Sequence, residues 1–409
     1  KAGVFVYRTI EDLNAIMAYG EKLANSENKK AAVLGGGLLG LEAAKAVMDM
    51  GLDPYVVEFA SRLMPRQLDD AGANILKAII EELGIKVLTN KNTKCIGGNG
   101  KMTHLSFADG ANLDAQMLVI SAGIRPRDEL AKKCGLEIGE RGGVIVNNKM
   151  QTSDPDIYAI GEVALYRNQI YGLVAPGYEM AEVALEQILG GEKEMQGEID
   201  MSTKLKLIGT DVASFGDAFG EEACRTIVLE DKYTGIYKRI NVTEDGERLL
   251  GGMLVGDAED YNMLLQIAQN GMALPPNPED LILGARGGEG SIGSVLDFPD
   301  SAVICSCENV SKGDILHAVT EEGCENLKAV SKLNKACTGC GGCKPMVKDL
   351  IEAALKSMGK TVKTVICEHF QYNRQELYDI IKVKGIKTYD EALDILGKGD
   401  GCETSKNGS

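Results

Sequence analysis

The sequence lacks several features that would each indicate a particular class of protein. It contains no tryptophan, three histidines and 5% aromatic residues, so nucleic-acid binding through stacked aromatics on a basic surface has little support. The formal charge of −16 argues in the same direction, because a nucleic-acid surface needs clustered positive charge. No apolar run reaches the roughly 18 residues of a membrane-spanning helix, and no signal peptide opens the chain. We therefore expect a cytoplasmic protein that binds neither nucleic acid nor membrane.

Glycine and cysteine, in contrast, are abundant. The 409 residues include 49 glycines, which suit the tight turns of nucleotide-binding α/β folds, and the chain is long enough for several domains. Eleven cysteines, several in close pairs, fit a reducing compartment and metal binding better than a disulfide framework. Neither end of the chain resembles a natural terminus, so we expect a fragment of a longer protein. The isolated cysteines are expected to be buried core thiols: Cys95, Cys134, Cys224 and Cys324.

A glycine-rich turn predicts a dinucleotide-binding site. An apolar strand beginning at Ala31 leads into Gly35, Gly37 and Gly40, and a helical pattern follows. Such glycines admit a pyrophosphate to the helix N-terminus, where the helix dipole stabilises its charge. Glu58 ends the next strand, at the spacing where an acidic residue bonds ribose hydroxyls and repels a 2′-phosphate. The pattern predicts NAD(P)H binding and favours NADH, with a glycine turn in an unrelated α/β fold as the alternative.

Two short-spaced cysteine pairs predict a metal centre in the second half of the chain. Cys305 and Cys307 form a Cys-x-Cys pair, and Cys340 and Cys343 form a Cys-x-x-Cys pair among glycines. Four thiolates suit either zinc or an iron–sulfur cluster. Cys337 lies three residues before Cys340 and makes a competing pair, so spacing alone does not identify the ligands.

Several blocks, in order along the chain, resemble the pyridine nucleotide–disulfide oxidoreductases, a family of flavoproteins that bind two dinucleotides. These blocks are the fingerprint turn, the hinge-like segment 4–12, the segment 121–126 and the segment 152–162. Segments 62–69, 171–176, 202–206 and 249–257 and the cysteine block are similar to the large-subunit family of NAD(P)H-dependent assimilatory nitrite reductases. This second resemblance covers nearly the whole chain.

The resemblance implies roles for individual residues. Gly123 would belong to the NAD site, and Glu42 would lie near the nicotinamide, although Glu42 fits a carboxylate interacting with the helix dipole equally well. Gly161 and Glu162 would lie beside FAD, whose domain would have its first half before the start of this chain. The cysteine module resembles bacterioferritin-associated-ferredoxin-like [2Fe-2S] domains, and the ligands of that family correspond to Cys305, Cys307, Cys340 and Cys343.

The cofactors and partners follow from the same resemblance. Electrons would pass from NAD(P)H, with NADH favoured, through FAD to a [2Fe-2S] cluster, and then to a sirohaem nitrite reductase domain or small subunit. Sirohaem and a [4Fe-4S] cluster would occur only in a longer chain, because the cysteine pairs that hold them do not appear here. A homodimer is compatible with the sequence. The rival hypotheses are a flavin-dependent NADH oxidoreductase that reduces a rubredoxin- or ferredoxin-like acceptor, and a zinc-stabilised nucleotide-binding scaffold.

The expected fold class is α/β, with a Rossmann-type NAD(P)H domain, a partial FAD domain, an α+β domain and a small helical [2Fe-2S] domain. The expected boundaries are 1–27 for a hinge and FAD-domain remnant, 28–126 for the NAD(P)H domain, 127–192 for the C-terminal part of the FAD domain, 193–283 for the α+β interface domain, 284–299 for a glycine-rich linker, 300–360 for the [2Fe-2S] domain, and 361–409 for the start of a second helical module.

Overall fold

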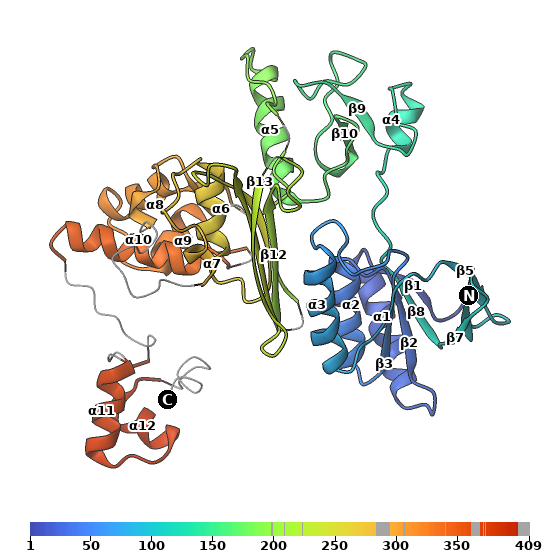
Figure 1. Ribbon diagram of the computed structural model, residues 1–409, viewed down its shortest axis with the longest axis horizontal. Helices are drawn as coiled ribbons and strands as arrows, with labels where there is room; N and C mark the ends of the chain where they lie inside the picture. Colours follow the sequence, from blue (N-terminus) through green and yellow to red (C-terminus); the bar gives the residue numbers. More distant parts are fainter. Residues whose placement is uncertain are drawn as a thin grey trace.

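The computed structural model (Figure 1) describes residues 1–197, 199–207, 209–222, 224–283, 295–305, 308–339, 341–360, 369–370, 372 and 374–399. It confirms the predicted mixed α/β architecture with a small helical domain that carries the cysteine pairs. Within the described residues, no helix combines the length and apolar character that a membrane crossing requires.

A five-stranded parallel sheet in the order β1-β8-β2-β3-β4 forms the nucleotide-binding domain. Side chains alternate between its two faces, so Ala31 and Val33 enter one core and Ala32 enters another. Three helices cover the first face, and a small antiparallel sheet covers the second. The elements are β1 (Val4–Val6), α1 (Ile10–Ala24), β2 (Lys30–Leu34), α2 (Leu38–Asp49), β3 (Asp53–Val57), α3 (Asp70–Glu82), β4 (Lys86–Leu88), β5 (Thr93–Gly97), β6 (His104–Phe107), β7 (Asn112–Asp114) and β8 (Met117–Ile120).

The start of the chain belongs to this sheet, although the sequence placed residues 1–27 in a hinge and an FAD-domain remnant. Strand β1 pairs in parallel with β8, with Val4 opposite Leu118. Thr9 caps α1 through a capping box with Asp12, and Ile16 and Leu23 of α1 are buried in the same core as α2 and α3. Backbone pairing and this buried helix face therefore tie residues 4–24 to the nucleotide-binding domain.

The segment after β8 forms a smaller unit with its own core. Strands β9 and β10 pair in parallel, and helix α5 packs beside them through Met180 and Val183. The elements of this unit are α4 (Glu129–Lys133), β9 (Val144–Val146), η1 (Gly161–Val163), β10 (Ala164–Tyr166) and α5 (Val174–Ile188).

A five-stranded antiparallel sheet has the order β11-β12-β15-β14-β13, and its three central strands are buried on both faces. Val212, Met253 and Val255 enter the core of the nucleotide-binding domain, whereas Phe215 and Leu254 enter a second core with α6. Figure 1 shows this sheet standing between the blue nucleotide-binding domain and the gold and orange helices. The elements are β11 (Thr203–Leu207), β12 (Thr210–Gly216), β13 (Cys224–Asp231), β14 (Ile236–Thr243), β15 (Leu249–Gly256), α6 (Tyr261–Gln269) and α7 (Asp280–Leu283).

The cysteine-carrying domain is a small bundle built around Ile315, Val330 and Leu350. Phe298 is buried in this core, so residues 295–299 pack with this domain and not in the expected linker. Residues 284–294 lie outside the described residues. The elements are η2 (Val295–Asp297), β16 (Val303–Cys305), β17 (Val310–Ser311), α8 (Lys312–Thr320), α9 (Leu327–Asn334) and α10 (Lys344–Ser357). Beyond them, α11 (Arg374–Lys384) and α12 (Tyr389–Leu396) share a separate small core.

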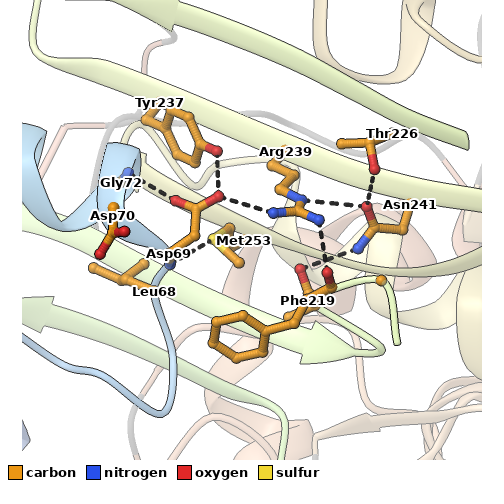
Figure 2. Close-up of polar contacts among 12 residues, drawn as sticks. Leu68, Asp69, Asp70, Gly72, Phe219, Thr226, Tyr237, Arg239, Asn241 and Met253 are labelled. Carbon is orange, nitrogen blue, oxygen red and sulfur yellow. Dashed lines mark hydrogen bonds and ion pairs between the residues drawn. The ribbon is translucent and has the colours of Figure 1, made fainter. Parts of the chain in front are cut away.

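One carboxylate, that of Asp69, makes hydrogen bonds between the nucleotide-binding domain and the antiparallel sheet, in addition to the packing of their shared core (Figure 2). Asp69 caps α3 by accepting the N–H of Gly72, at 2.9 Å. Its other oxygen accepts hydrogen bonds from the Tyr237 hydroxyl, at 2.6 Å, and from Arg239 Nη1, at 2.9 Å. Burial alone would raise the pKa of Asp69, but the hydrogen bonds from Tyr237, Gly72 and Arg239 outweigh burial and hold that pKa below its usual value.

Replacing Asp69 with asparagine is expected to lower the free energy of unfolding by about 2 kcal/mol at neutral pH, because Arg239 loses its buried partner. The folded-state pKa of Asp69 lies below the ordinary value of 3.8, so its charge stabilises the fold above that pH. The difference between the two proteins should therefore shrink as the pH falls through the folded-state pKa. Urea unfolding of both proteins at several pH values measures this difference in the free energy of unfolding.

Asp70→Asn is the matched control, because the Asp70 side chain is 80% exposed and that of Asp69 only 20%. Its effect should stay within about 0.5 kcal/mol. Equal destabilisation by the two substitutions would contradict a role for Asp69 in joining the domains.

Candidate functional site: a nucleotide turn and a cysteine centre

The glycine turn after β2 is closed against the end of β8. Gly35 has a φ of +118°, and a Cβ added there would lie 2.4 Å from the carbonyl oxygen of Ser121. A Cβ on Gly40 would lie 2.0 Å from the carbonyl oxygen of Gly35. Only glycine fits these two positions, and the close approach that they allow brings α2 against the strands.

The N-terminus of α2 is open where Gly37 forms its cap. No side chain caps this helix, and a Cβ added to Gly37 would meet nothing within 4 Å. The first N–H groups of a helix need partners, and the helix dipole favours an anion there. The turn therefore fits the pyrophosphate of a dinucleotide.

Glu58 lies where the carboxyl ends of β2 and β3 meet. Its two carboxylate oxygens accept the N–H groups of Gly36 and Ala60, each at 2.6 Å. Arg62, on the loop that follows, donates to the carbonyl oxygen of Leu68 at 2.9 Å. The Glu58 carboxylate can accept a ribose hydroxyl and would repel a 2′-phosphate. Arg62 is hydrogen-bonded within its own loop, so its position also suits a free ribose hydroxyl better than a 2′-phosphate.

The other predicted nucleotide residues lie on the same part of the domain. Gly123 has a φ of +84° in the turn after β8, two residues beyond the Ser121 carbonyl that Gly35 approaches. Glu42 is exposed near the start of α2. Their roles remain predictions.

The two predicted flavin-side residues contact both α5 and the hinge-like segment. Gly161 adopts a φ of +73° and donates its N–H to Met180 Sδ on α5, at 3.2 Å. Glu162 pairs with Arg8 at 2.8 Å. The resemblance singled out segment 4–12 and Glu162 separately, and the structure brings them together. The sequence predicted no partner for Arg8.

Three buried thiols, those of Cys305, Cys337 and Cys343, converge where two segments meet. We call these segments, around Cys305 and around residues 337–343, the cysteine loops. Cys305 ends β16, and Cys343 caps α10. Cys337, with a φ of +67°, places its Sγ 3.3 Å from that of Cys343. Hydrogen bonds from the Cys343 thiol and from the N–H groups of Cys337 and Glu308 outweigh burial and lower the pKa of Cys305 to about 6. The hydrogen bond to Cys305 and burial raise the pKa of Cys343.

This donor set fits a thiolate-bound centre, because backbone N–H groups already stabilise the charge of one sulfur. Cys307 and Cys340 lie outside the described residues, and among those described no group of three or more metal-ligating side chains is arranged to hold an ion. The ligand set Cys305, Cys307, Cys340 and Cys343 therefore stays a prediction, and Cys337 stays a competitor beside Cys343.

The expectation for the isolated cysteines was wrong in two cases. Cys95 and Cys134 are exposed, whereas Cys224 and Cys324 are half-buried. Cys95 lies on the small outer sheet, and Cys134 ends the short helix α4, which has no buried residue. Neither element has a face deep enough to bury a thiol at these positions.

Three known protein families match separate parts of the chain. Residues 1–187 match the pyridine nucleotide-disulphide oxidoreductase family. Residues 202–272 match the rubredoxin NAD+ reductase C-terminal domain, and residues 303–353 match the BFD-like [2Fe-2S] binding domain.

Curated relatives cover nearly the whole chain. The nitrite reductase (NADH) large subunit of Escherichia coli (strain K12) is 50% identical over 98% of this chain and 47% of its own length. The nitrite reductase [NAD(P)H] large subunit of Klebsiella oxytoca is 50% identical over 99% of this chain and 42% of its own length. The chain thus spans less than half the length of these relatives. One solved structure that resembles this chain is the NAD-dependent persulfide reductase from A. fulgidus. The match covers 66% of this chain and 53% of the chain of that structure, with a TM-score of 0.58 and 26% sequence identity.

Gly37→Ala and Gly40→Ala should separate binding from folding. A methyl group on Gly37 enters open space, so stability should stay within about 1 kcal/mol of wild type, while affinity for NADH falls at least about tenfold. A methyl group on Gly40 meets the Gly35 carbonyl, so that variant should unfold at a clearly lower temperature. Calorimetry of NADH binding and thermal unfolding measure the two effects. Wild-type NADH affinity in the Gly37→Ala variant would place the dinucleotide elsewhere.

Proposed function

This chain is homologous to the large subunits of NAD(P)H-dependent nitrite reductases, and we propose that it forms the electron-input part of such a subunit. In such a subunit, electrons would pass from NADH through FAD and a [2Fe-2S] cluster to a sirohaem nitrite reductase domain or small subunit. Sirohaem and a [4Fe-4S] cluster belong to that partner. Bound FAD would convert a hydride into single electrons, and the cluster would carry them one at a time.

One arrangement carries the proposal: the nucleotide turn and the cysteine loops lie on opposite sides of the same antiparallel sheet. One face of this sheet closes the core of the nucleotide-binding domain, and the other face supports α6, which contacts the cysteine loops. A zinc scaffold has no need for this linkage, whereas an electron path between the two sites requires it.

The chain's own residues hold and orient the cofactors in this account. Gly37 and the α2 N-terminus receive the pyrophosphate, Glu58 accepts a ribose hydroxyl, and Gly123 leaves room beside the turn. Glu42 would lie near the nicotinamide. The remaining proposed contacts are Gly161 and Glu162 for FAD, and Cys305, Cys307, Cys340 and Cys343 for the cluster.

The location and assembly belong to the proposal as well. A reducing cytoplasm suits a site built from free thiols, because an oxidising compartment would pair them as disulfides. The proposal is compatible with a homodimer and does not require one.

A second candidate function is the reduction of a separate rubredoxin- or ferredoxin-like acceptor. It is favoured by the match of residues 202–272 to a rubredoxin reductase domain. The rubredoxin-NAD(+) reductase of Pseudomonas putida is also 37% identical over 42% of this chain. Comparing nitrite-linked turnover with turnover on an added rubredoxin distinguishes the two candidates.

Anaerobic addition of NADH to the holoprotein tests the proposal. The flavin absorbance should bleach first, and the electron paramagnetic resonance signal of a reduced [2Fe-2S] cluster should follow. Iron and acid-labile sulfide should be present in equal amounts. Zinc without sulfide, or a cluster that NADH leaves oxidised, would contradict the proposed function.

The cysteine variants act as internal controls for the ligand set. Cys343→Ser should abolish the visible absorbance of the cluster, and Cys337→Ser should retain it. The opposite result would leave the electron path intact and make Cys337 the ligand in place of Cys343.

A further inference from the structure

Two side-chain amides on α6 reach the two loops that carry the cysteines. Asn262 Nδ2 donates to the carbonyl oxygen of Gly342, and Gln266 Nε2 donates to that of Val303, both at 2.8 Å. Gly342 directly precedes Cys343, and Val303 lies two residues before Cys305. Residues four apart share a face of a helix, so one face of α6 contacts both loops at once.

The Gln266 amide is buried and held in a fixed orientation. Only 3% of this residue is exposed. Asn270 Nδ2 donates to Gln266 Oε1, at 3.1 Å, which turns the NH2 group toward the Val303 carbonyl. A buried amide is unfavourable unless its hydrogen bonds are made, and an apolar side chain would fill this position more simply. The amide therefore serves a specific contact.

Apolar packing supports the same contact. Met263 and Met272 pack both against the core of the antiparallel sheet and against the core of the cysteine-carrying domain. The two domains thus meet through packed side chains as well as hydrogen bonds.

Helix α5 brings the flavin-side loop and a cysteine loop onto one element. Met180 of α5 accepts the N–H of Gly161, and Glu182 of α5 accepts a hydrogen bond from Asn309 Nδ2, at 2.8 Å. Asn309 follows the first cysteine pair by two residues. Met180 and Glu182 lie about 3 Å apart along the helix axis, given the rise per residue of an α-helix. The two loops therefore contact α5 within a single turn, on different faces of the helix, because residues two apart lie about 200° apart around its axis.

We propose that Asn262 and Gln266 are positioning residues for electron transfer, which hold both cysteine loops in place, with Asn309 against α5, so that reduction of the cluster takes place within one chain. This inference rests on the proposed function. The two amides touch no reacting atom; they act through the backbone of the loops. Electron transfer slows steeply with distance, so loosening the loops should slow this one step and leave the nucleotide site unchanged.

The test uses Asn262→Leu and Gln266→Met, which keep the side-chain size and remove the donors, singly and together. Asn25→Leu is the matched control, because the Asn25 amide also donates to a backbone carbonyl oxygen, that of Glu21 at 3.1 Å, within the nucleotide-binding domain. Rapid mixing of each holoprotein with NADH follows flavin reduction and cluster reduction separately. Dithionite reduction and iron–sulfide content report on the cluster itself. Hydrogen exchange reports on opening of residues 303–305 and 341–343.

In the double variant we expect NADH-driven cluster reduction to slow, and exchange in the two loops to accelerate, by about tenfold, because each lost hydrogen bond shifts the docked equilibrium several-fold. Flavin reduction, dithionite reduction and cluster content should match wild type, as should every property of Asn25→Leu. Should the double variant lose its iron, the single variants carry the test, with effects of about threefold each.

Cluster reduction and loop exchange within about twofold of wild type in the donor-free variants would overturn this inference and leave the proposed function standing. A wild-type cluster that NADH does not reduce would overturn the proposed function instead. Equal slowing in Asn25→Leu would also overturn the inference, because it would show a general effect of removing a side-chain amide donor.

Discussion

Burial of the antiparallel sheet on both faces is the constraint on which the rest of the structure depends. Side chains alternate along its strands, so Val212 and Val255 pack against the nucleotide-binding domain while Phe215 and Leu254 pack under α6. A sheet covered on both sides cannot shift in register without exposing one of the two cores. The sheet thus fixes the nucleotide turn relative to the helix that holds the cysteine loops.

Hydrogen bonds on both faces of this sheet make the orientation of the neighbouring domains specific. On the nucleotide side, Asp69 caps α3 and accepts hydrogen bonds from Tyr237 and Arg239 of the sheet. On the opposite side, Asn262 and Gln266 bond the backbone of the cysteine loops. Each of these groups is at least half-buried, so a shifted arrangement would leave polar atoms without partners. Packing brings the domains together, and these bonds select one orientation.

Local signals in the sequence were sufficient for the elements that depend on neighbouring residues. The capping boxes at Thr9 and Ser311 and the strand–turn–helix around Gly35 follow from short-range spacing, and the structure contains all three. Two contacts join residues more than 100 positions apart in the sequence: the pairing of β1 with β8 and the Asp69–Arg239 ion pair. No local sequence pattern predicts either contact. The exposed Cys95 and Cys134 show the same limit, because the burial of a thiol depends on which face its element presents.

The candidate site divides in the same way. Motifs identified Gly35, Gly37, Gly40 and Glu58, because their spacing reflects the chemistry of a dinucleotide. Family resemblance supplied roles for Glu162 and the cysteine pairs and singled out the segment that contains Arg8, but it gave no role to Arg8 or to the α6 amides. Their partners become apparent only when the chain folds and brings distant groups beside them.

The central claim is that the cluster is reduced within the chain that binds NADH. Its most direct test is the rate of cluster reduction after rapid anaerobic mixing with saturating NADH, measured over a wide range of protein concentrations. Transfer within one chain predicts a rate constant that does not change with protein concentration. A rate that rises in proportion to protein concentration would mean that electrons cross between molecules, and would contradict the account.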